Sequence, residues 1–185
     1  IGEKNMNNAL KKYIEKAAYQ EAPYTNSIEF VSYLNEATPD SLKYMIDDMF
    51  KTITLYDNRV KNFTSKKLPN GKYEVTINAQ VSKYRSDAKG KRSFQNAYGK
   101  TLTFKGKGEK YAVDSYPLSD YVEVGIFGEQ KVKGKTKEKQ LYLKKHKINK
   151  IDNKFVIIVD EKPTEVGIDP YNKLIDTNSE DNRRK

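Results

Sequence analysis

The spacing of apolar residues changes near Tyr56, and this change constrains the fold more than any other feature of the chain. Before Tyr56, apolar residues recur at intervals of three and four, which places them on one face of a helix. After it, they alternate with polar residues, as they do in a strand with one solvent-exposed face. The pattern predicts an α+β fold, with a short helical segment over residues 1–56 and an antiparallel β-sandwich over residues 57–170.

Three helices are predicted within the first segment. The apolar face of the first consists of Met6, Leu10, Tyr13, Ile14, Ala17 and Ala18. Asn26 followed by Glu29 has the spacing of a capping box, which predicts the start of the second helix. Thr38-Pro39-Asp40 predicts the third start, because Thr38 can accept a bond from a free N–H and Pro39 suits the first helical position. The apolar stripe of this third helix is Leu42, Met45, Ile46, Met49, Phe50 and Ile53.

Alternation is clearest over residues 73–82, and Pro69-Asn70-Gly71 before it indicates a type I′ hairpin with a partner strand at about 59–68. Further strands are predicted at 121–127, 140–148, 155–159 and 166–168, with a weaker one near 98–104. Short strands separated by turns are typical of an antiparallel sandwich, and we expect the immunoglobulin-like type. The polar stretch 83–117 is expected to be a long excursion between strands. The charged tail 171–185 is expected to fray after Ile175.

The formal net charge of +10 comes from the middle of the chain. Residues 1–56 carry −2, residues 57–162 carry +13 and residues 163–185 carry −1. Lysines occupy every second position from Lys131 to Lys139, and could track the phosphates of a nucleic acid, with Tyr142 and Tyr84-Arg85 adding base stacking. The chain matches no helix-turn-helix, ribonucleoprotein-type aromatic motif or Gly-rich RNA clamp. We therefore favour a solvated face with a guarded edge strand, and expect no nucleic acid.

Missing residue types exclude several kinds of site. Without Cys there is no thiolate nucleophile, Cys-ligated zinc, iron–sulfur cluster or disulfide. Because His146 is the only histidine, a two-His metal site and an H-E-x-x-H helix are also excluded. No apolar run approaches the ~20 residues that span a bilayer, and residues 1–4 do not resemble a signal peptide. We expect a soluble segment whose membrane attachment, if any, lies outside this chain.

The individual candidates for chemistry are weak. His146 would need an orienting carboxylate and a nucleophile to act as a general base, and between lysines it fits a surface position better. Asp47 and Asp48 are adjacent, so on a helix their side chains diverge by about 100° and chelate one ion poorly. Gly106-Lys107-Gly108 lacks the flanking strand, helix and third Gly of a phosphate loop. The prolines in Val159–Tyr171 end two strands, which is a structural signature. We predict no catalytic, cofactor-binding or metal-binding residue in this chain.

Several runs of residues resemble one enzyme family, in the same order along the chain. They are Ile1-Gly2-Glu3-Lys4, Pro23-Tyr24-Thr25, Thr38-Pro39-Asp40-Ser41-Leu42, Thr52-Ile53-Thr54-Leu55-Tyr56-Asp57-Asn58 and Gly167-Ile168-Asp169-Pro170-Tyr171-Asn172-Lys173-Leu174-Ile175-Asp176. The runs are similar to the C-terminal portion of the gluzincin zinc aminopeptidases, those like aminopeptidase N. They are especially similar to the bacterial form in which the peptidase is joined to an ABC-transporter permease. The resemblance covers most of 1–83 and 118–182 and is weakest over 84–117.

This resemblance implies that the zinc ligands, the general-base Glu and the catalytic Tyr lie upstream of Ile1, in a membrane-associated parent protein. The chain would then be the non-catalytic C-terminal part, in which the last helices of the catalytic lobe precede a sandwich that positions it. Its partners would be the upstream catalytic and membrane domains of the same polypeptide, with peptide substrate bound mainly elsewhere. Zinc would belong to the upstream domain, and no cofactor is expected here. The isolated helices could self-associate through an exposed apolar face.

Two other classes of function stay open. The chain could be a free-standing basic β-sandwich module that binds nucleic acid or another anionic polymer, in which case binding would weaken steeply with salt. It could also be a cell-surface interaction module, because sandwiches carry many such roles and the fold alone does not decide between them.

Overall fold

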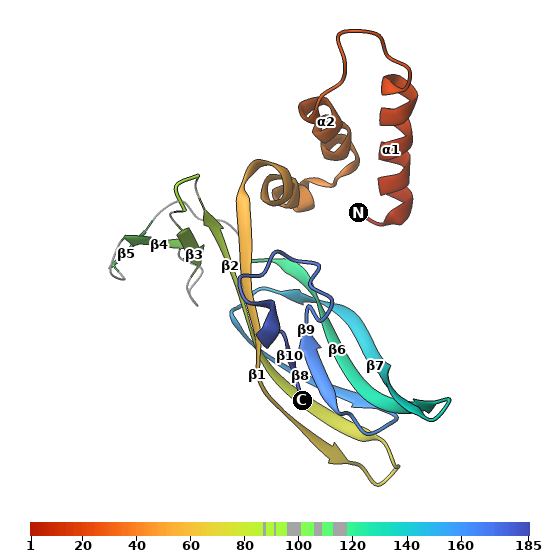
Figure 1. Ribbon diagram of the computed structural model, residues 1–185. Coiled ribbons are helices and arrows are strands. Elements are labelled where there is room, and N and C mark those ends of the chain that lie inside the picture. Colours follow the sequence, from red (N-terminus) through yellow and green to blue (C-terminus); the bar gives the residue numbers. More distant parts are fainter. Residues whose placement is uncertain (87, 91, 96–100, 106–108, 113–117) are drawn as a thin grey trace. The chain divides into compact units, whose positions relative to one another are not determined.

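The computed structural model describes residues 1–86, 88–90, 92–95, 101–105, 109–112 and 118–185, except the side chains of 92–95, 101–105 and 109–112. The chain divides into two compact units, Ile1–Ile53 and Thr54–Lys185 (Figure 1). The first unit is helical and the second consists mostly of antiparallel sheets, so the predicted α+β class is confirmed. The division falls slightly before Tyr56, because the backbone is already extended from Ile53 onward.

The helical unit begins with two regular helices, α1 (Glu3–Ala17) and α2 (Ser27–Ala37). The predicted cap of α2 is confirmed: the side-chain oxygen of Asn26 accepts hydrogen bonds from the N–H groups of Ile28 and Glu29, each at 3.0 Å. The Glu29 carboxylate extends toward α1, where it pairs with Lys16 at 2.8 Å. The buried apolar residues of this unit are Ala9, Leu34 and Ile46.

The predicted third helix is confirmed as a helical segment over residues 40–51 that starts at Asp40, but it is not one regular α-helix. A 3₁₀ turn, η1 (Asp40–Leu42), precedes a single turn of α-helix, α3 (Lys43–Ile46), and a π-helical turn, η2 (Asp47–Lys51), follows it. Thr38 does not cap this segment, because its hydroxyl donates to the carbonyl of Leu34 at 2.6 Å and so closes the end of α2. The start of η1 has no side-chain cap. The β-branched Thr52 and Ile53 that follow favour a strand, which begins there.

The second unit contains two sheets. In the larger one, β1 to β5 pair in chain order and β8 adds to β2, whereas the other has the order β10-β9-β6-β7. The pairs β2·β8, β6·β7 and β6·β9 are antiparallel. The strands are β1 (Ile53–Lys67), β2 (Tyr73–Ser86), β3 (Arg92–Gln95), β4 (Thr101–Lys105), β5 (Glu109–Ala112), β6 (Asp120–Val132), β7 (Lys135–Ile148), β8 (Asp152–Val159), β9 (Glu165–Ile168) and β10 (Arg183–Arg184).

The predicted alternation in β2 is confirmed, and it builds the core. Its inward residues are at most 1 % exposed, as are the inward residues of β6 and β9 in the other sheet. These residues are Val75, Ile77, Ala79, Val81, Val122, Val124, Ile126, Val166 and Ile168. Because both sheets contribute to one apolar cluster, they pack face to face as in a β-sandwich.

Both long hairpins turn tightly, but through different turns. In the turn after β1, only Gly71 of Pro69-Asn70-Gly71 has a positive φ (85°), and its N–H donates to the carbonyl of Leu68 at 3.0 Å. The predicted hairpin is therefore confirmed but its type I′ geometry is wrong. The bond from Gly71 to Leu68 makes Pro69 and Asn70 the central residues, and Pro69 cannot adopt the positive φ of a type I′ turn. Between β6 and β7, Lys133 (φ 50°) and Gly134 (φ 77°) have the two left-handed conformations of a type I′ turn. The predicted strands at 121–127 and 140–148 extend to this turn.

The stretch 83–117, predicted to be an excursion, contains strands in its described parts. β2 continues to Ser86 and its last residues pair with β3, which pairs with β4, and β4 with β5. The weak strand predicted near 98–104 corresponds to β4, while residues 96–100 lie outside the described residues. The alternation in β4 is only five residues long, and the surrounding Lys and Gly residues conceal it.

The prediction of a frayed tail is wrong. The N–H of Ile168 donates to the carbonyl of Asn182 at 2.8 Å, and Arg183 and Arg184 then form β10 beside β9. Asn182 is fully buried. We call residues 169–185 the C-terminal segment. Its anchors are backbone and polar side-chain groups, which need partners when buried but leave no apolar periodicity in the sequence.

Candidate functional site

The C-terminal segment leaves β9 through a turn that Asp169 stabilises. Asp169 is 2 % exposed, has a φ of 46°, and accepts hydrogen bonds from the N–H groups of Lys173 (3.0 Å) and Leu174 (2.9 Å) on its two carboxylate oxygens. Burial raises the pKa of Asp169, and the two N–H donors oppose that rise. Asp before Pro170 suits this turn, since aspartate tolerates the left-handed conformation and bonds to nearby backbone.

Two glycines let this turn lie close against the four-stranded sheet. A Cβ on Gly167 would lie 2.7 Å from the Cβ of Pro170, and one on Gly125 would lie 2.8 Å from the ring of Phe127. Phe127 is fully buried. The ring of Tyr171 packs edge-on against it with 6.1 Å between the two ring centres, and the Arg183 guanidinium lies 4.3 Å from the centre of the Phe127 ring. Gly125 alternates with core residues along β6, so these contacts cover the sheet face that points away from the core.

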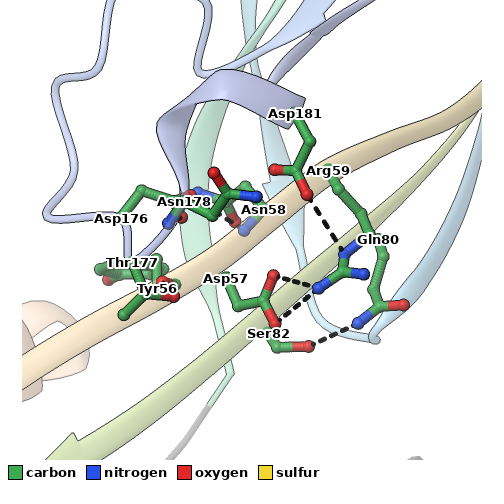
Figure 2. A network of polar contacts seen from close by, with 10 residues as sticks. All are labelled: Tyr56, Asp57, Asn58, Arg59, Gln80, Ser82, Asp176, Thr177, Asn178 and Asp181. Carbon is green, nitrogen blue, oxygen red and sulfur yellow. Dashed lines mark hydrogen bonds and ion pairs between the residues drawn. The ribbon is translucent and has the colours of Figure 1, made fainter.

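The segment then crosses to β1 in the other sheet, where Figure 2 shows its polar contacts. The N–H of Tyr56 donates to the carbonyl of Ile175 at 2.9 Å, and the N–H of Asn58 donates to the carboxylate of Asp176 at 2.9 Å. The N–H of Thr177 returns a bond to the carbonyl of Tyr56 at 3.0 Å. The C-terminal segment thus links the two sheets through backbone hydrogen bonds.

An arginine lies beside these contacts on β1. One terminal nitrogen of Arg59 donates to both oxygens of Asp57, at 2.7 and 2.9 Å, and its Nε lies 3.9 Å from Asp181 (Figure 2). The bond to Asp57 raises the pKa of Arg59, while burial raises the pKa of Asp181. A guanidinium shared between two carboxylates is poorly placed to bind an anionic ligand, so we assign this network a structural role.

A buried ion pair connects β2 to β6. The ammonium of Lys83 lies 3.0 and 3.2 Å from the two oxygens of Asp120, and the hydroxyl of Tyr56 donates to the same carboxylate at 3.2 Å. Lys83 is 2 % exposed and Asp120 is 6 % exposed. Because such a pair recovers its desolvation cost only in one geometry, it favours one alignment of the two sheets. In the sequence, Lys83 was assigned to the excursion 83–117 and Asp120 fell just before a predicted strand, so neither residue was expected to be buried.

The candidates considered for catalysis do not come together. His146 is half-buried on β7, with its Nε2 at 2.8 Å from the hydroxyl of Tyr142 and its ring 5.0 Å from that of Phe155. Burial, assisted by the charge of Lys144, lowers the pKa of His146. Its polar partner is thus a phenol instead of the carboxylate that orients a general base.

The other candidates are similarly dispersed. Asp47 pairs with Lys51 at 2.7 Å, whereas the adjacent Asp48 is 8 % exposed. Tyr84, considered for base stacking, is also 8 % exposed, so its ring is not available to a base. Gly106-Lys107-Gly108 lies outside the described residues. In the part of the chain that the structure describes, no group of three or more His, Asp or Glu side chains could hold a metal ion.

The helical unit carries a surface that sequence reasoning placed in the core. Ile28 is 81 % exposed, Met49 66 % and Phe50 44 %, although Met49 and Phe50 belong to the apolar stripe predicted for the third helix. A cleft of about 360 Å³ lies on this unit, lined by Ser27, Ile28, Val31, Ser32, Asn35, Phe50 and Lys51. The helical spacing of apolar residues in the sequence, which was interpreted as marking buried faces, was the signal that could have revealed this site. We call Ile28, Val31 and Phe50, the apolar residues that line this cleft, the apolar face.

No protein-family model, curated protein or solved structure matches this chain. Among the described helices, none is both long and apolar enough to cross a membrane.

Proposed function

We propose that this chain is the non-catalytic C-terminal part of a membrane-associated zinc metalloaminopeptidase, and that it acts by positioning the catalytic lobe. The observation that carries the proposal is the apolar face. Of the thirteen exposed large apolar residues described, eight lie within Ile1–Ile53, a unit that buries only Ala9, Leu34 and Ile46 in its own core. Apolar exposure on this scale in so small a unit indicates a surface that another protein region covers.

The sequence resemblance identifies the region that would cover it. In gluzincin aminopeptidases the equivalent helices close the catalytic lobe, so the apolar face would pack against the helices upstream of Ile1. The second unit would then be the domain that braces this lobe, with the immunoglobulin-like arrangement of the family. Zinc and the reacting groups would belong to the upstream domain.

Contacts within the second unit support the same proposal. Two of the runs that resemble the family, Thr52–Asn58 and Gly167–Asp176, are more than a hundred residues apart in sequence. They meet where Tyr56 bonds to Ile175 and Asn58 bonds to Asp176. Because the two runs bond to each other, a change in one would disturb the other. This contact gives a reason why both runs would occur together in members of one family.

The parent polypeptide allows a direct test of the docking role. We expect Ile28→Lys to lower the thermal stability of the parent peptidase and its activity, because a charge would enter the interface with the upstream helices. Ile158→Lys is the matched control, since Ile158 is also exposed (55 %) but lies on β8 of the second unit. In the isolated chain both substitutions should leave the unfolding midpoint unchanged. Equal effects of the two substitutions in the parent would contradict the proposal.

The isolated chain gives a second test. We expect no stoichiometric zinc by elemental analysis and no hydrolysis of aminoacyl substrates. The coding sequence upstream of Ile1 should contain an H-E-x-x-H helix and a further Glu ligand. Robust aminopeptidase activity of this chain, or an upstream sequence without that motif, would overturn the proposal.

A further inference from the structure

Two hairpin tips of the second unit carry a concentrated positive charge. The tip between β1 and β2 spans residues 66–72 and the tip between β6 and β7 spans residues 131–137. Together they hold seven lysines and no acidic residue. The seven are Lys66, Lys67, Lys72, Lys131, Lys133, Lys135 and Lys137, and all are exposed. We call these two segments the basic tips.

The basic tips lie at the same end of the sandwich. Both hairpins point in one direction in Figure 1. The connection from β8 to β9 ties them together: Asp160 pairs with Lys72 at 2.8 Å, Glu161 pairs with Lys139, and the N–H of Thr164 donates to the carbonyl of Phe127 at 2.8 Å. The charge therefore forms one surface, although it comes from segments about sixty residues apart in sequence.

Most of this charge has no acidic counterpart in the part of the chain that the structure describes. Lys72 is paired, but the other six lysines of the basic tips have no ion pair among the described residues. Six exposed cations at one end attract an extended anionic surface over about a Debye length, ~8 Å at physiological salt. Some cations elsewhere on the same unit are neutralised, as in the pairs of Lys61 with Asp152 and Lys173 with Glu123.

We propose that the basic tips dock this unit onto a membrane surface rich in anionic phospholipid. Along β7, Lys135 and Lys137 share one face, whereas Lys131 of β6 pairs with Thr136 and so lies on the other face. The lysines therefore project from both faces of the ribbon and do not line a groove that could follow a nucleic-acid strand. The tips contain no aromatic residue for base stacking and no arginine for bidentate phosphate recognition. Each tip does contain an aliphatic residue, Leu68 or Val132, that is half-exposed among lysines and suits the headgroup boundary. The inference uses the charge of the tips and does not depend on the peptidase relationship.

The test measures binding of the full 185-residue chain to vesicles by co-sedimentation. We expect binding to phosphatidylcholine vesicles that contain about one third phosphatidylglycerol, no binding to pure phosphatidylcholine, and release at ~0.5 M NaCl. The tip variant carries K131Q, K133Q, K135Q and K137Q. The control variant carries K145Q, K147Q, K150Q and K154Q, which are exposed lysines of the same unit outside the tips. Both lose four charges, so the formal net charge falls from +10 to +6 in each.

The tip variant should bind the anionic vesicles roughly 100- to 1,000-fold more weakly, because each lysine near the surface contributes about fivefold. The control variant should lose less than about tenfold. Circular dichroism and unchanged unfolding midpoints verify that both variants are folded.

Equal losses in the two variants, or no binding by the original chain, would overturn the proposal. Tighter binding to duplex DNA than to the vesicles at equal phosphate concentration would also overturn it, in favour of a nucleic-acid partner. None of these results bears on the docking of Ile28, which the parent polypeptide tests separately.

Discussion

The two units of the chain differ in how they use their apolar residues. Thr54–Lys185 buries seventeen apolar residues and exposes five large ones, whereas Ile1–Ile53 buries three and exposes eight, counted over the residues that the structure describes. Both units show regular apolar periodicity in the sequence. Periodicity indicates which face of an element avoids water, but it does not identify the partner that covers this face. In the sandwich, the two sheets cover each other's apolar faces. The apolar face of the helical unit requires a partner outside that unit.

The largest effect should come from separating the two units. We expect residues 54–185 alone to unfold in one cooperative transition, and residues 1–53 alone to have no stable tertiary structure, because units of this size with so few buried side chains rarely fold without support. Thermal unfolding followed by circular dichroism distinguishes them. A cooperative transition of monomeric 1–53 would remove the contrast between the units.

The same contrast can be tested with one residue type. Ile77 is fully buried in β2, whereas Ile28 is 81 % exposed in α2. Ile77→Ala should lower the free energy of unfolding by about 2–5 kcal/mol, since it leaves a cavity in the core. Ile28→Ala should change it by less than about 0.5 kcal/mol. Urea unfolding of both variants provides the values, and a large loss from Ile28→Ala would mean that this chain itself covers the apolar face.

A smaller loss of stability should distinguish the hydrogen bonds that hold the C-terminal segment from ordinary surface ion pairs. Asp176 accepts hydrogen bonds from the N–H groups of Asn58 and Asn178, each at 2.9 Å, and Asp176→Ala should cost about 1–3 kcal/mol. Asp152→Ala is the control, because Asp152 makes an exposed pair with Lys61 at 2.6 Å worth at most about 1 kcal/mol. Equal losses in urea unfolding would show that the C-terminal segment is held no more firmly than a surface ion pair.

The smallest expected effect is the pH dependence that His146 contributes. Burial and the charge of Lys144 lower the pKa of His146 in the folded chain, so the unfolded chain binds the proton more readily. Its contribution to stability is complete above the ordinary pKa of histidine. That contribution is lost as the pH falls through the ordinary value toward the lowered one. The groups facing the ring are Tyr142, Phe155 and Lys144.

Urea unfolding between pH ~5 and ~8 measures this slope. His146→Gln should flatten it, and Lys144→Gln should reduce it only in part, because burial is the larger cause of the shift. A steeper slope in His146→Gln would mean that the ring is stabilised when protonated, contrary to this account.

The sequence allowed prediction of elements whose cause is local. Alternation predicted β2 and its core residues, and Asn26 predicted the start of α2, because both depend on neighbouring residues. The hairpin after β1 was also predictable from Pro69-Asn70-Gly71, although its turn type was not. The extents of β6 and β7 were underestimated, because near the turn both faces of these strands carry polar residues and the apolar alternation is lost.

Features that depend on distant partners could not be predicted. Thr38 matched a helix start, but the carbonyl of Leu34 competes for its hydroxyl. The C-terminal segment is held by the backbone of Ile168 and β1, so its own residues show only charge and turn formers. The pair of Lys83 with Asp120 requires two sheets to come together. The apolar face was visible as periodicity, but its exposure was not.

The position of β10 has a consequence for the order of events during folding. β9 pairs with β6 on one side and with β10 on the other, and Arg183 of β10 also covers the ring of Phe127. Until β10 has paired, β9 presents an open edge beside an uncovered aromatic ring. In that state the chain is most open to pairing with another copy or to chaperone capture.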